Sequence, residues 1–137
     1  MTNIVKLLQN LSIVSNNDMD ADKNEIFFNK LDEHHQIWLV EDKVNQKIIG
    51  TGTILIEHKL IRNYAKVAHL EDIVILPAYQ NQKIGTMLVD HLIKIAQELK
   101  CYKCILHCNP MLVKFYEKNN FSNYGSHMRL DLELNEI

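Results

Sequence analysis

Two acidic residues interrupt an apolar run that is followed by a loop without acids. Glu71 and Asp72 lie within His69–Ile75, and the loop QNQKIGT, residues 80–86, comes shortly after. Burying a carboxylate costs free energy unless it has a partner, so both acids are candidates for function. Adjacent residues of a strand point to opposite faces, which excludes a glycosidase-type pair in one cleft. A hydrogen bond at a strand edge is the ordinary structural alternative for each acid.

The 80–86 loop leads into an amphipathic segment. Apolar residues recur from Ile84 at helical spacing, which predicts a helix that begins there. The first turn of a helix has N–H groups without intrahelical acceptors, and together with the helix dipole they attract anions. Lys83 would add to this attraction, and Gly85 would let an anion approach the backbone. The loop therefore fits a pyrophosphate site, although an ordinary turn has the same pattern.

Cysteine and histidine side chains gather in CYKCILHC, residues 101–108. We predict a short strand there, and residues three apart on a strand point to opposite sides. The side chains of Cys101, Cys104, His107 and Cys108 would then not converge on one ion, so we expect no metal. The chain has three cysteines, an odd number, and no recognisable export signal. Free thiols in a reducing compartment, the cytoplasm, are the simpler expectation.

The composition of the chain narrows its class and partners. With 137 residues, 47% of them hydrophobic and 23% charged, we expect one globular domain over residues 1–137. Its 17 acidic and 15 basic residues argue against a sequence-independent nucleic-acid binder, which needs a basic face. No apolar run approaches the ~18 residues that span a bilayer. We therefore expect neither nucleic acid nor membrane as a partner.

Two helices and a hairpin are expected in the first half of the chain. Apolar residues at helical spacing predict a helix over residues 3–13, and Asp20 or Asp22 would cap a second helix. The inner face of this second helix would carry Ile26, Phe27 and Leu31. IWLVED and KIIGTGTILIEH are apolar and β-branched around a polar turn at 42–47, which predicts the hairpin.

The second half completes a mixed α/β layer. A strand over residues 70–76, stopped by Pro77, precedes the helix from Ile84 and the strand within 101–108. Asn109 and Pro110 predict the start of another helix, with Tyr116 on its inner side. The alternating segment FSNYGSHMRLDLEL, residues 121–134, is expected to close the chain as a strand.

The loop resembles motif A of the GNAT superfamily, the acetyl-CoA-dependent N-acetyltransferases. That pattern places Gln or Arg, two residues, Gly, one residue, and Gly or Ala between a strand and a helix. Gln80 and Gly85 match it, and Lys83 stands where the first Gly is expected.

Four blocks resemble one family of that superfamily, the glucosamine-6-phosphate N-acetyltransferases. The blocks are IEHKLIRNYAKVAHLED, HLEDIVI, CYKCILHC and VKFYEKNNFSN, and Leu112 replaces an Asn of the family pattern. They occur in the family's order, and the resemblance covers roughly residues 4–130.

The resemblance implies the fold and the reaction. The fold would be the α/β GNAT acyl-CoA N-acyltransferase fold, a mixed central sheet flanked by helices. The usual first strand would be lacking, because the sequence starts at a helix. The reaction would be direct attack of the amine of D-glucosamine 6-phosphate on acetyl-CoA in a ternary complex, giving N-acetyl-D-glucosamine 6-phosphate for UDP-N-acetylglucosamine biosynthesis.

The resemblance also implies the acetyl-CoA residues. The backbone of Ile73, Val74 and Ile75 would lie along the pantetheine arm. Tyr116 would lie near the CoA sulfur as general acid, although a Tyr on the inner side of a helix is most often part of the core. The pyrophosphate would be held by the N–H groups of Gln80, Asn81, Gln82, Lys83, Ile84, Gly85 and Thr86.

For the amino sugar, Glu71 would receive the amine proton and Asp72 would bind a sugar hydroxyl. The family has an acid where His107 stands, so His107 would orient the amine or serve as the base itself. Its ordinary alternative is a solvated interface histidine. The phosphate would meet Lys59 and Arg62.

The resemblance implies two further contacts with the amino sugar, through Arg129 and Ser12. The family has an Arg where Asp131 stands, and Arg129, two residues earlier, would face the same way in a strand. Ser12 falls where the family has a substrate-contacting Thr, although a hydroxyl at a helix end is an equally good interpretation.

A homodimer is expected, because a sheet without its first strand has an edge that a partner can cover. The C-terminal strand HMRLDLELNEI could cross over to a partner. Two other functions stay open: a GNAT enzyme for another small amine, and a non-catalytic acetyl-CoA-binding regulatory domain. The departures at Lys83, His107 and Asp131 would suit the regulatory domain. A cationic substrate would prefer an acidic cleft, whereas the three predicted phosphate contacts are basic.

Overall fold

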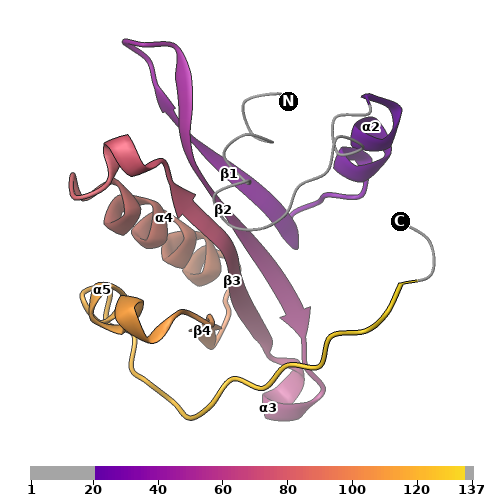
Figure 1. Ribbon diagram of the computed structural model, residues 1–137. Coiled ribbons are helices and arrows are strands. Elements are labelled where there is room, and N and C mark those ends of the chain that lie inside the picture. Colours follow the sequence, from indigo (N-terminus) through magenta and orange to yellow (C-terminus); the bar gives the residue numbers. More distant parts are fainter. Residues whose placement is uncertain (1–20, 135–137) are drawn as a thin grey trace. The chain divides into compact units, whose positions relative to one another are not determined.

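The structure, a computed structural model, describes residues 21–134 (Figure 1). It divides into two compact units, one that ends at Leu106 and one that begins at His107. In the described part of the first unit, the elements in chain order are α2 (Ala21–Asn29), β1 (His35–Asp42), β2 (Lys47–His58), α3 (Ile61–Tyr64), β3 (Lys66–Ile75), the 3-10 helix η2 (Pro77–Tyr79), α4 (Ile84–Glu98) and β4 (Lys103–Ile105). The second unit contains the 3-10 helix η3 (Pro110–Leu112) and α5 (Val113–Glu117).

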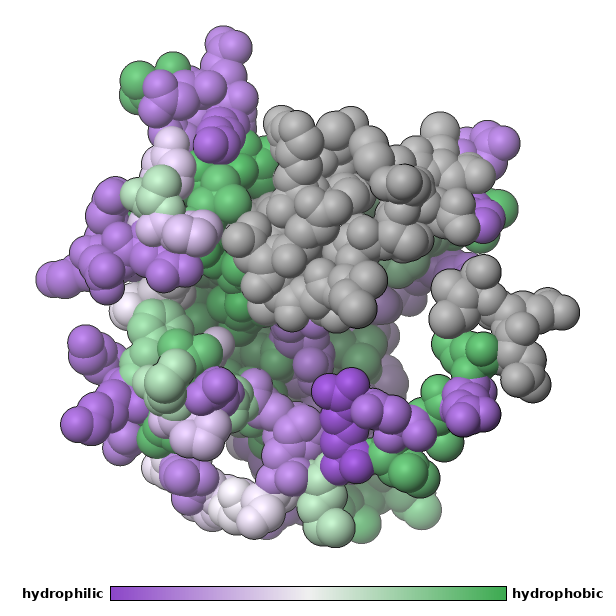
Figure 2. Space-filling view, viewed as in Figure 1, coloured by the Kyte–Doolittle hydropathy of each residue, from purple (hydrophilic) through white to green (hydrophobic). Residues whose placement is uncertain are grey.

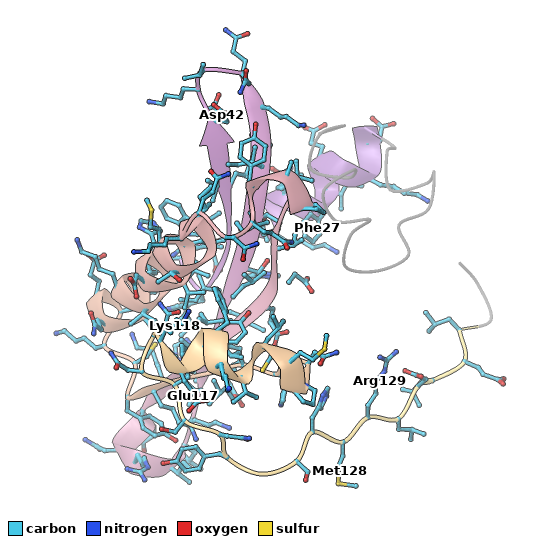
Figure 3. All side chains as sticks on the ribbon, turned by 60° about the vertical axis from the view of Figure 1, so that its left-hand side comes forward. Phe27, Asp42, Glu117, Lys118, Met128 and Arg129 are labelled. Carbon is cyan, nitrogen blue, oxygen red and sulfur yellow. The ribbon has the colours of Figure 1, made fainter. Side chains whose placement is uncertain are left out.

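The predicted hairpin is confirmed as the antiparallel pair β1–β2. Asp42 caps its turn, because one carboxylate oxygen accepts hydrogen bonds from the backbone N–H groups of Val44 and Asn45. The other oxygen accepts one from the side-chain amide of Asn45 at 2.8 Å. Figure 3 shows Asp42 at the end of this hairpin.

The sheet has the order β1-β2-β3-β4, and only the pair β3–β4 is parallel. β3 is longer than the predicted strand 70–76, because pairing with β2 extends it back to Lys66. β4 is shorter than the predicted strand and pairs with β3 only from Val67 to His69. Beyond His69, the described residues give β3 no partner strand on its β4 side.

The predicted helix from Ile84 is confirmed as α4, which lies against the sheet (Figure 1). Gly52 of β2 allows this contact: a Cβ there would lie 3.1 Å from Leu92 Cδ1 and 3.3 Å from Ile73 Cγ1. The face of β2 that carries Gly52 and Ile54 therefore faces α4. The buried residues of the helix are Leu88, Val89, Leu92, Ile95 and Ala96.

The second unit begins its helical part where the sequence predicts. The Asn109 side chain accepts a hydrogen bond from the N–H of Met111 at 3.0 Å, and Pro110 occupies the first helical position. The first turn is a 3-10 turn, and α5 continues from it. Tyr116 is buried as predicted, and its ring meets those of Phe115 and Phe121 edge-on.

The prediction that residues 121–134 form a strand is wrong for this chain by itself. They contain no strand, and Met128, Leu130, Leu132 and Leu134 are 71–90% exposed. The alternation is real, and Figure 2 shows green and purple patches following one another toward the C-terminal end. A strand needs a neighbour for its backbone N–H and C=O groups, and this segment has no such neighbour within its own unit. We call residues 121–134 the C-terminal arm.

The prediction for the second helix is wrong in one respect, the direction of its apolar side chains. A helix follows the predicted cap region as α2, but Ile26 and Phe27 are 59% and 42% exposed rather than turned into a core. The predicted helix 3–13 and the predicted contact Ser12 lie outside the described residues. Among residues 21–134, no helix has the length and apolar character to cross a bilayer.

Candidate active site

The two acids of β3 lie on either side of a break in the strand. Asp72 has a φ of 51°, and together with Ile73 it opposes Gly52 alone, which makes a β-bulge. The extra residue breaks the alternation after Asp72, so the expectation that Glu71 and Asp72 point to opposite faces stays a prediction. Both acids are exposed, so the burial cost that drew attention to them does not arise.

The bulge determines which way the following residues point. Ile73 and Ile75 lie beside the positions where Cβ atoms of Gly52 and Gly50 would be, on the α4 face. Regular alternation from Leu70, which also faces α4, would have sent Ile73 to the other face. Glu71 pairs with Thr53 and lies on the face turned away from α4.

The backbone after Glu71 has an open edge. Val74 and Ile75 pair with Thr51 and Gly50 of β2, whereas no described strand pairs with them on the opposite side. The Gln80 side chain donates a hydrogen bond to the Ile75 carbonyl at 3.0 Å. The segment 73–75, predicted to bind the pantetheine arm, thus has an open strand edge. One of its carbonyls, that of Ile75, already accepts a hydrogen bond from the following loop.

The loop before α4 has the shape of an anion site. Asn81 and Lys83 adopt left-handed backbone conformations, with φ of 65° and 64°. The first helical bond of α4 runs from the N–H of Met87 to the carbonyl of Lys83, at 3.1 Å. The N–H groups of the first turn have no acceptor within the helix, and this turn contains no acid. Gly85 lies in this turn with a helical φ, and without a Cβ it leaves the backbone open to an anion.

Lys83 departs from the GNAT pattern at a position where glycine has a physical reason. A non-glycine residue in the left-handed region costs about 1–2 kcal/mol, because its Cβ crowds the following carbonyl oxygen. Lys83 therefore combines backbone strain with a positive charge at the start of α4.

The loop is tied to the hairpin by one side-chain contact. The Tyr79 hydroxyl donates a hydrogen bond to the Asp42 carboxylate at 2.8 Å. Hydrogen bonds from Asn45 and then Tyr79 hold the pKa of Asp42 below its ordinary value, and the bond to Asp42 raises the pKa of Tyr79. The start of the loop thus has a fixed neighbour outside its own segment.

Both cations of the predicted phosphate segment have partners within the first unit. The Lys59 ammonium lies 2.9 Å from the Glu57 carboxylate, whose other oxygen lies 2.8 Å from His69 Nε2. Arg62 stacks over the Tyr102 ring at 4.8 Å from its centroid. α3 is a left-handed turn, because Arg62, Asn63 and Tyr64 all have positive φ.

The second unit carries Tyr116, His107 and Arg129. Burial raises the pKa of Tyr116 to about 12, so the phenol keeps its proton at neutral pH. The His107 ring stacks on that of His127 with centroids 4.2 Å apart. Arg129 donates a hydrogen bond to Asp131, the residue that replaces the expected arginine.

Figure 3 shows Met128 and Arg129 on opposite sides of the C-terminal arm. The charges of Arg129 and Asp131 compensate each other in this arrangement, so a phosphate would have to compete with Asp131 for Arg129.

Glu57, His69, Tyr102 and His127 take part in these contacts and were not singled out from the sequence. Glu57, His69 and Tyr102 lie inside the blocks that carry the family resemblance, which was the available signal. His127 lies in the C-terminal arm, where alternation suggested a strand and nothing marked a histidine pair.

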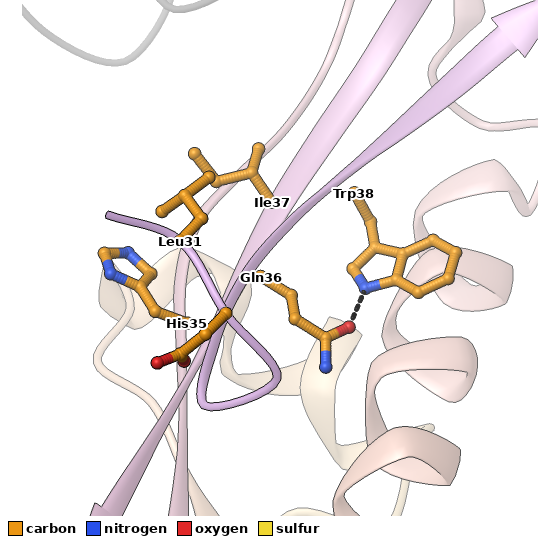
Figure 4. A pocket seen from close by; sticks show the side chains of 6 residues that line it. Leu31, His35, Gln36, Ile37 and Trp38 are labelled. Atoms are coloured by element: carbon orange, nitrogen blue, oxygen red, sulfur yellow. Dashed lines mark hydrogen bonds between the residues drawn. The ribbon is translucent and has the colours of Figure 1, made fainter. Parts of the chain in front are cut away.

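An open surface depression lies apart from the predicted site residues (Figure 4). It is lined by Leu31, Asp32, His35, Gln36, Ile37 and Trp38. The Trp38 indole donates a hydrogen bond to Gln36 at 2.8 Å and meets the His91 ring edge-on. Over the described residues 21–134, no three His, Cys, Asp or Glu side chains form a metal-binding group.

Comparisons with known proteins agree with the fold and the motif. The sequence model of the acetyltransferase (GNAT) family matches residues 4–121, across both units. A crystal structure of glucosamine-6-phosphate N-acetyltransferase from Arabidopsis thaliana superposes with a TM-score of 0.84 at 29% identity, covering 96% of this chain and 90% of the other. A predicted acetyltransferase with acetyl-CoA from Clostridium acetobutylicum shares the fold, with a TM-score of 0.71 at 21% identity over 95% and 88% of the two chains.

Several curated relatives carry the name glucosamine 6-phosphate N-acetyltransferase. The Schizosaccharomyces pombe relative is 38% identical over 69% of this chain and 86% of its own length. The Arabidopsis thaliana relative is 30% identical over 90% and 84% of the two lengths. The match to the Candida albicans relative, 44% identical over 59% of this chain, spans 54% of that protein. The chain thus belongs to the acetyltransferase (GNAT) family and, within it, to the glucosamine 6-phosphate N-acetyltransferase group.

Proposed function

We propose that the protein transfers the acetyl group of acetyl-CoA to the amine of D-glucosamine 6-phosphate, giving N-acetyl-D-glucosamine 6-phosphate and CoA. The observation that carries this proposal is the strand edge at 73–75, which leads through an acid-free loop to the start of α4. Relatives matched over 84% and 86% of their length carry the name of this activity. The same reaction would supply the acetylated sugar for UDP-N-acetylglucosamine biosynthesis.

Acetyl-CoA binds along this edge. Its pantetheine arm pairs with the backbone of Ile73, Val74 and Ile75 as an added strand would, although Gln80 already bonds the Ile75 carbonyl. Its pyrophosphate binds the N–H groups of residues 80–86, and the Lys83 charge adds attraction. Backbone N–H groups at the open edge stabilise the oxyanion that forms when the thioester carbonyl is attacked.

The chemistry needs one proton acceptor and one proton donor. The amine attacks the thioester carbonyl, and its proton passes to Glu71, through a water molecule, or to His107. Collapse of the tetrahedral intermediate breaks the carbon–sulfur bond, and the CoA sulfur leaves as a thiolate. Tyr116 protonates this thiolate, a role that suits a phenol whose pKa is raised to about 12 because it still carries its proton at neutral pH.

The amino sugar is held through its phosphate and hydroxyl groups. Lys59 and Arg62 bind the phosphate, and Asp72 binds a sugar hydroxyl. Ser12 contributes a hydroxyl group that contacts the sugar. Arg129 binds the phosphate once its side chain has released Asp131. The basic character of Lys59, Arg62 and Arg129 favours an anionic substrate over a polyamine or a protein lysine.

The functional unit is a homodimer in which the C-terminal arm pairs with a second copy. Four apolar side chains in the second half of the arm, Met128, Leu130, Leu132 and Leu134, alternate with polar ones and are largely exposed. Pairing with a partner strand would bury them and satisfy the backbone of the arm. His107 and His127 would then lie close to a shared interface.

The protein works in the cytoplasm. The three cysteines, Cys101, Cys104 and Cys108, are free thiols, which suits a reducing compartment. Cell fractionation with an antibody to the protein tests this location, and recovery in a membrane or secreted fraction would reject it.

The activity is tested by measuring CoA release from acetyl-CoA. Glucosamine 6-phosphate is the test substrate, with unphosphorylated glucosamine and spermidine as controls. Release with the phosphorylated sugar alone supports the proposal, and release with spermidine instead would keep the fold and reject the substrate. Binding of acetyl-CoA without release to any amine would indicate a regulatory acetyl-CoA-binding domain.

A further inference from the structure

The Glu57 carboxylate lies between two basic side chains. One of its oxygens lies 2.8 Å from His69 Nε2, and the other lies 2.9 Å from the Lys59 ammonium. Hydrogen bonds from His69 and then Lys59 hold the pKa of Glu57 below its ordinary value, so the carboxylate is ionised at neutral pH and accepts only. His69 Nε2 therefore carries the proton of this bond, and the plane of the carboxylate is fixed by a donor at each oxygen.

The three side chains differ in how firmly the fold holds them. His69 pairs with Leu55 of β2 on one side and Ile105 of β4 on the other, in the middle of the sheet. Its side chain is 23% exposed, compared with 42% for Glu57. Lys59 follows the end of β2 and belongs to the turn that leads into α3. The Lys59 side chain is 34% exposed, so His69 is the most firmly held of the three.

These groups lie on the face of the sheet that is turned away from α4. Glu57 alternates with Ile56, and Ile56 lies on the α4 face with Gly52 and Ile54. Glu57 pairs with Val67, and alternation then places His69 and Glu71 on the same face as Val67. Glu71, the proposed proton acceptor, is thus two residues from His69 along one face of β3.

We propose that Glu57 is a positioning residue, itself held by His69, that orients Lys59 for the phosphate of the amino sugar. The inference rests on the proposed function and adds two residues to it. A free lysine side chain loses rotamer freedom when it binds a phosphate, whereas a lysine already held by Glu57 has lost part of it beforehand. The Glu57 carboxylate also repels the phosphate, and the gain from orienting Lys59 outweighs this repulsion.

The test compares steady-state constants of the wild type and Glu57→Gln. Glutamine keeps the size of the side chain and removes its charge, which weakens both bridging contacts. We expect KM for glucosamine 6-phosphate to rise about 3- to 10-fold, as for loss of one charge-assisted contact. We expect kcat and KM for acetyl-CoA to stay within about twofold, because no reacting atom is touched. Glu98→Gln, at the exposed end of α4, is the matched control and should change neither constant.

Two further variants separate positioning from a general structural effect. His69→Gln should raise KM for the sugar phosphate in the same direction and by less, because it acts through Glu57. In a Lys59→Met background, Glu57→Gln should add almost no further rise in KM, since its effect passes through Lys59. Thermal unfolding of every variant checks that a change in KM is not a loss of folded protein.

The outcomes distinguish this inference from the proposed function. A wild type that releases no CoA with glucosamine 6-phosphate rejects the function and the inference with it. A wild type that is active, with Glu57→Gln unchanged or improved in KM for the sugar phosphate, rejects the inference alone. Additive effects of Glu57→Gln and Lys59→Met would also overturn it.

Discussion

The first unit, called here the sheet unit, and the C-terminal arm contain similar alternating sequences. These sequences form paired strands in the sheet unit and no strand in the arm. In the sheet unit, β3 is paired along its length with β2, and the face of β2 that carries Gly52 and Ile54 is covered by α4. In the C-terminal arm, the apolar side chains and the backbone find no neighbouring strand within their own unit. An alternating pattern therefore shows that a segment suits a strand, and the neighbour decides whether the strand forms. Substitutions in both regions test this difference.

The largest effect is expected in the second unit, at Tyr116. Tyr116→Phe keeps the buried ring and its edge-on contacts with Phe115 and Phe121 but removes the proton donor. We expect kcat to fall about 10²- to 10⁴-fold, the usual range for loss of a general acid, with little change in unfolding temperature. The wild type should lose no activity through Tyr116 as the pH rises to 9, because its pKa is raised to about 12.

Steady-state kinetics with a thiol-detecting reagent measures this effect, and Phe115→Leu is the packing control. A Tyr116→Phe enzyme with kcat within threefold or so of the wild type would leave Tyr116 as part of the core only.

The second prediction concerns the C-terminal arm. Replacing both Leu130 and Leu132 by Asp should weaken the proposed dimer by about 10²-fold or more, because each buried leucine contributes roughly 1.5–3 kcal/mol. Light scattering over a dilution series measures the dimer. Arg129→Gln and Glu133→Gln, which alternate with the leucines, are the matched control pair. A wild type that is monomeric at micromolar concentration would reject the dimer and the interface position of His107.

The sequence predicts those elements that depend on their own residues. α4 has its buried side chains at helical spacing, the β1–β2 hairpin has Asp42 at its turn, and Asn109 with Pro110 marks a helix start. Each of these signals is local, so a single sequence carries it. The family resemblance supplied the expected fold and reaction in the same way, from blocks of adjacent residues.

The features that the sequence does not predict depend on residues that are far apart along the chain. The bulge at Asp72 is set by the register between β2 and β3, and one extra residue leaves no mark in an apolar run. The contacts Glu57–His69 and His107–His127 join residues 12 and 20 positions apart. Predicting the first requires the register between β2 and β3, and predicting the second requires the path of the C-terminal arm. The predicted strand at 121–134 failed for a related reason, since a strand needs a neighbour and this segment has none within its own unit.

The third prediction concerns Lys83, whose backbone strain and positive charge can be tested separately. Lys83→Gly should relieve the left-handed strain at φ 64° and stabilise the fold by roughly 0.5–1 kcal/mol. It should also raise KM for acetyl-CoA about two- to fivefold, because a cation at an anion site is lost. Lys83→Met keeps the strain and removes only the charge, so it should show the change in KM without the gain in stability.

Chemical denaturation and initial rates separate these two effects. A Lys83→Gly variant that is less stable than the wild type would mean that the lysine side chain has a stabilising contact that outweighs the strain.

The smallest effect is expected where the loop meets the hairpin. The pKa of Asp42 is held below its ordinary value, about 4 in an unfolded chain, by hydrogen bonds from Asn45 and Tyr79. A carboxyl whose pKa is lower in the folded state adds stability above its unfolded pKa, and this stability is lost as the pH falls through the folded value. The unfolding temperature of Asp42→Asn should therefore lie slightly below that of the wild type at pH 7 and approach it below about pH 4. Tyr79→Phe, which removes one of the donors, should show a smaller difference with the same dependence on pH. A gap between wild type and Asp42→Asn that is constant from pH 7 to pH 3 would show that Asp42 acts through the shape of the turn rather than through its charge.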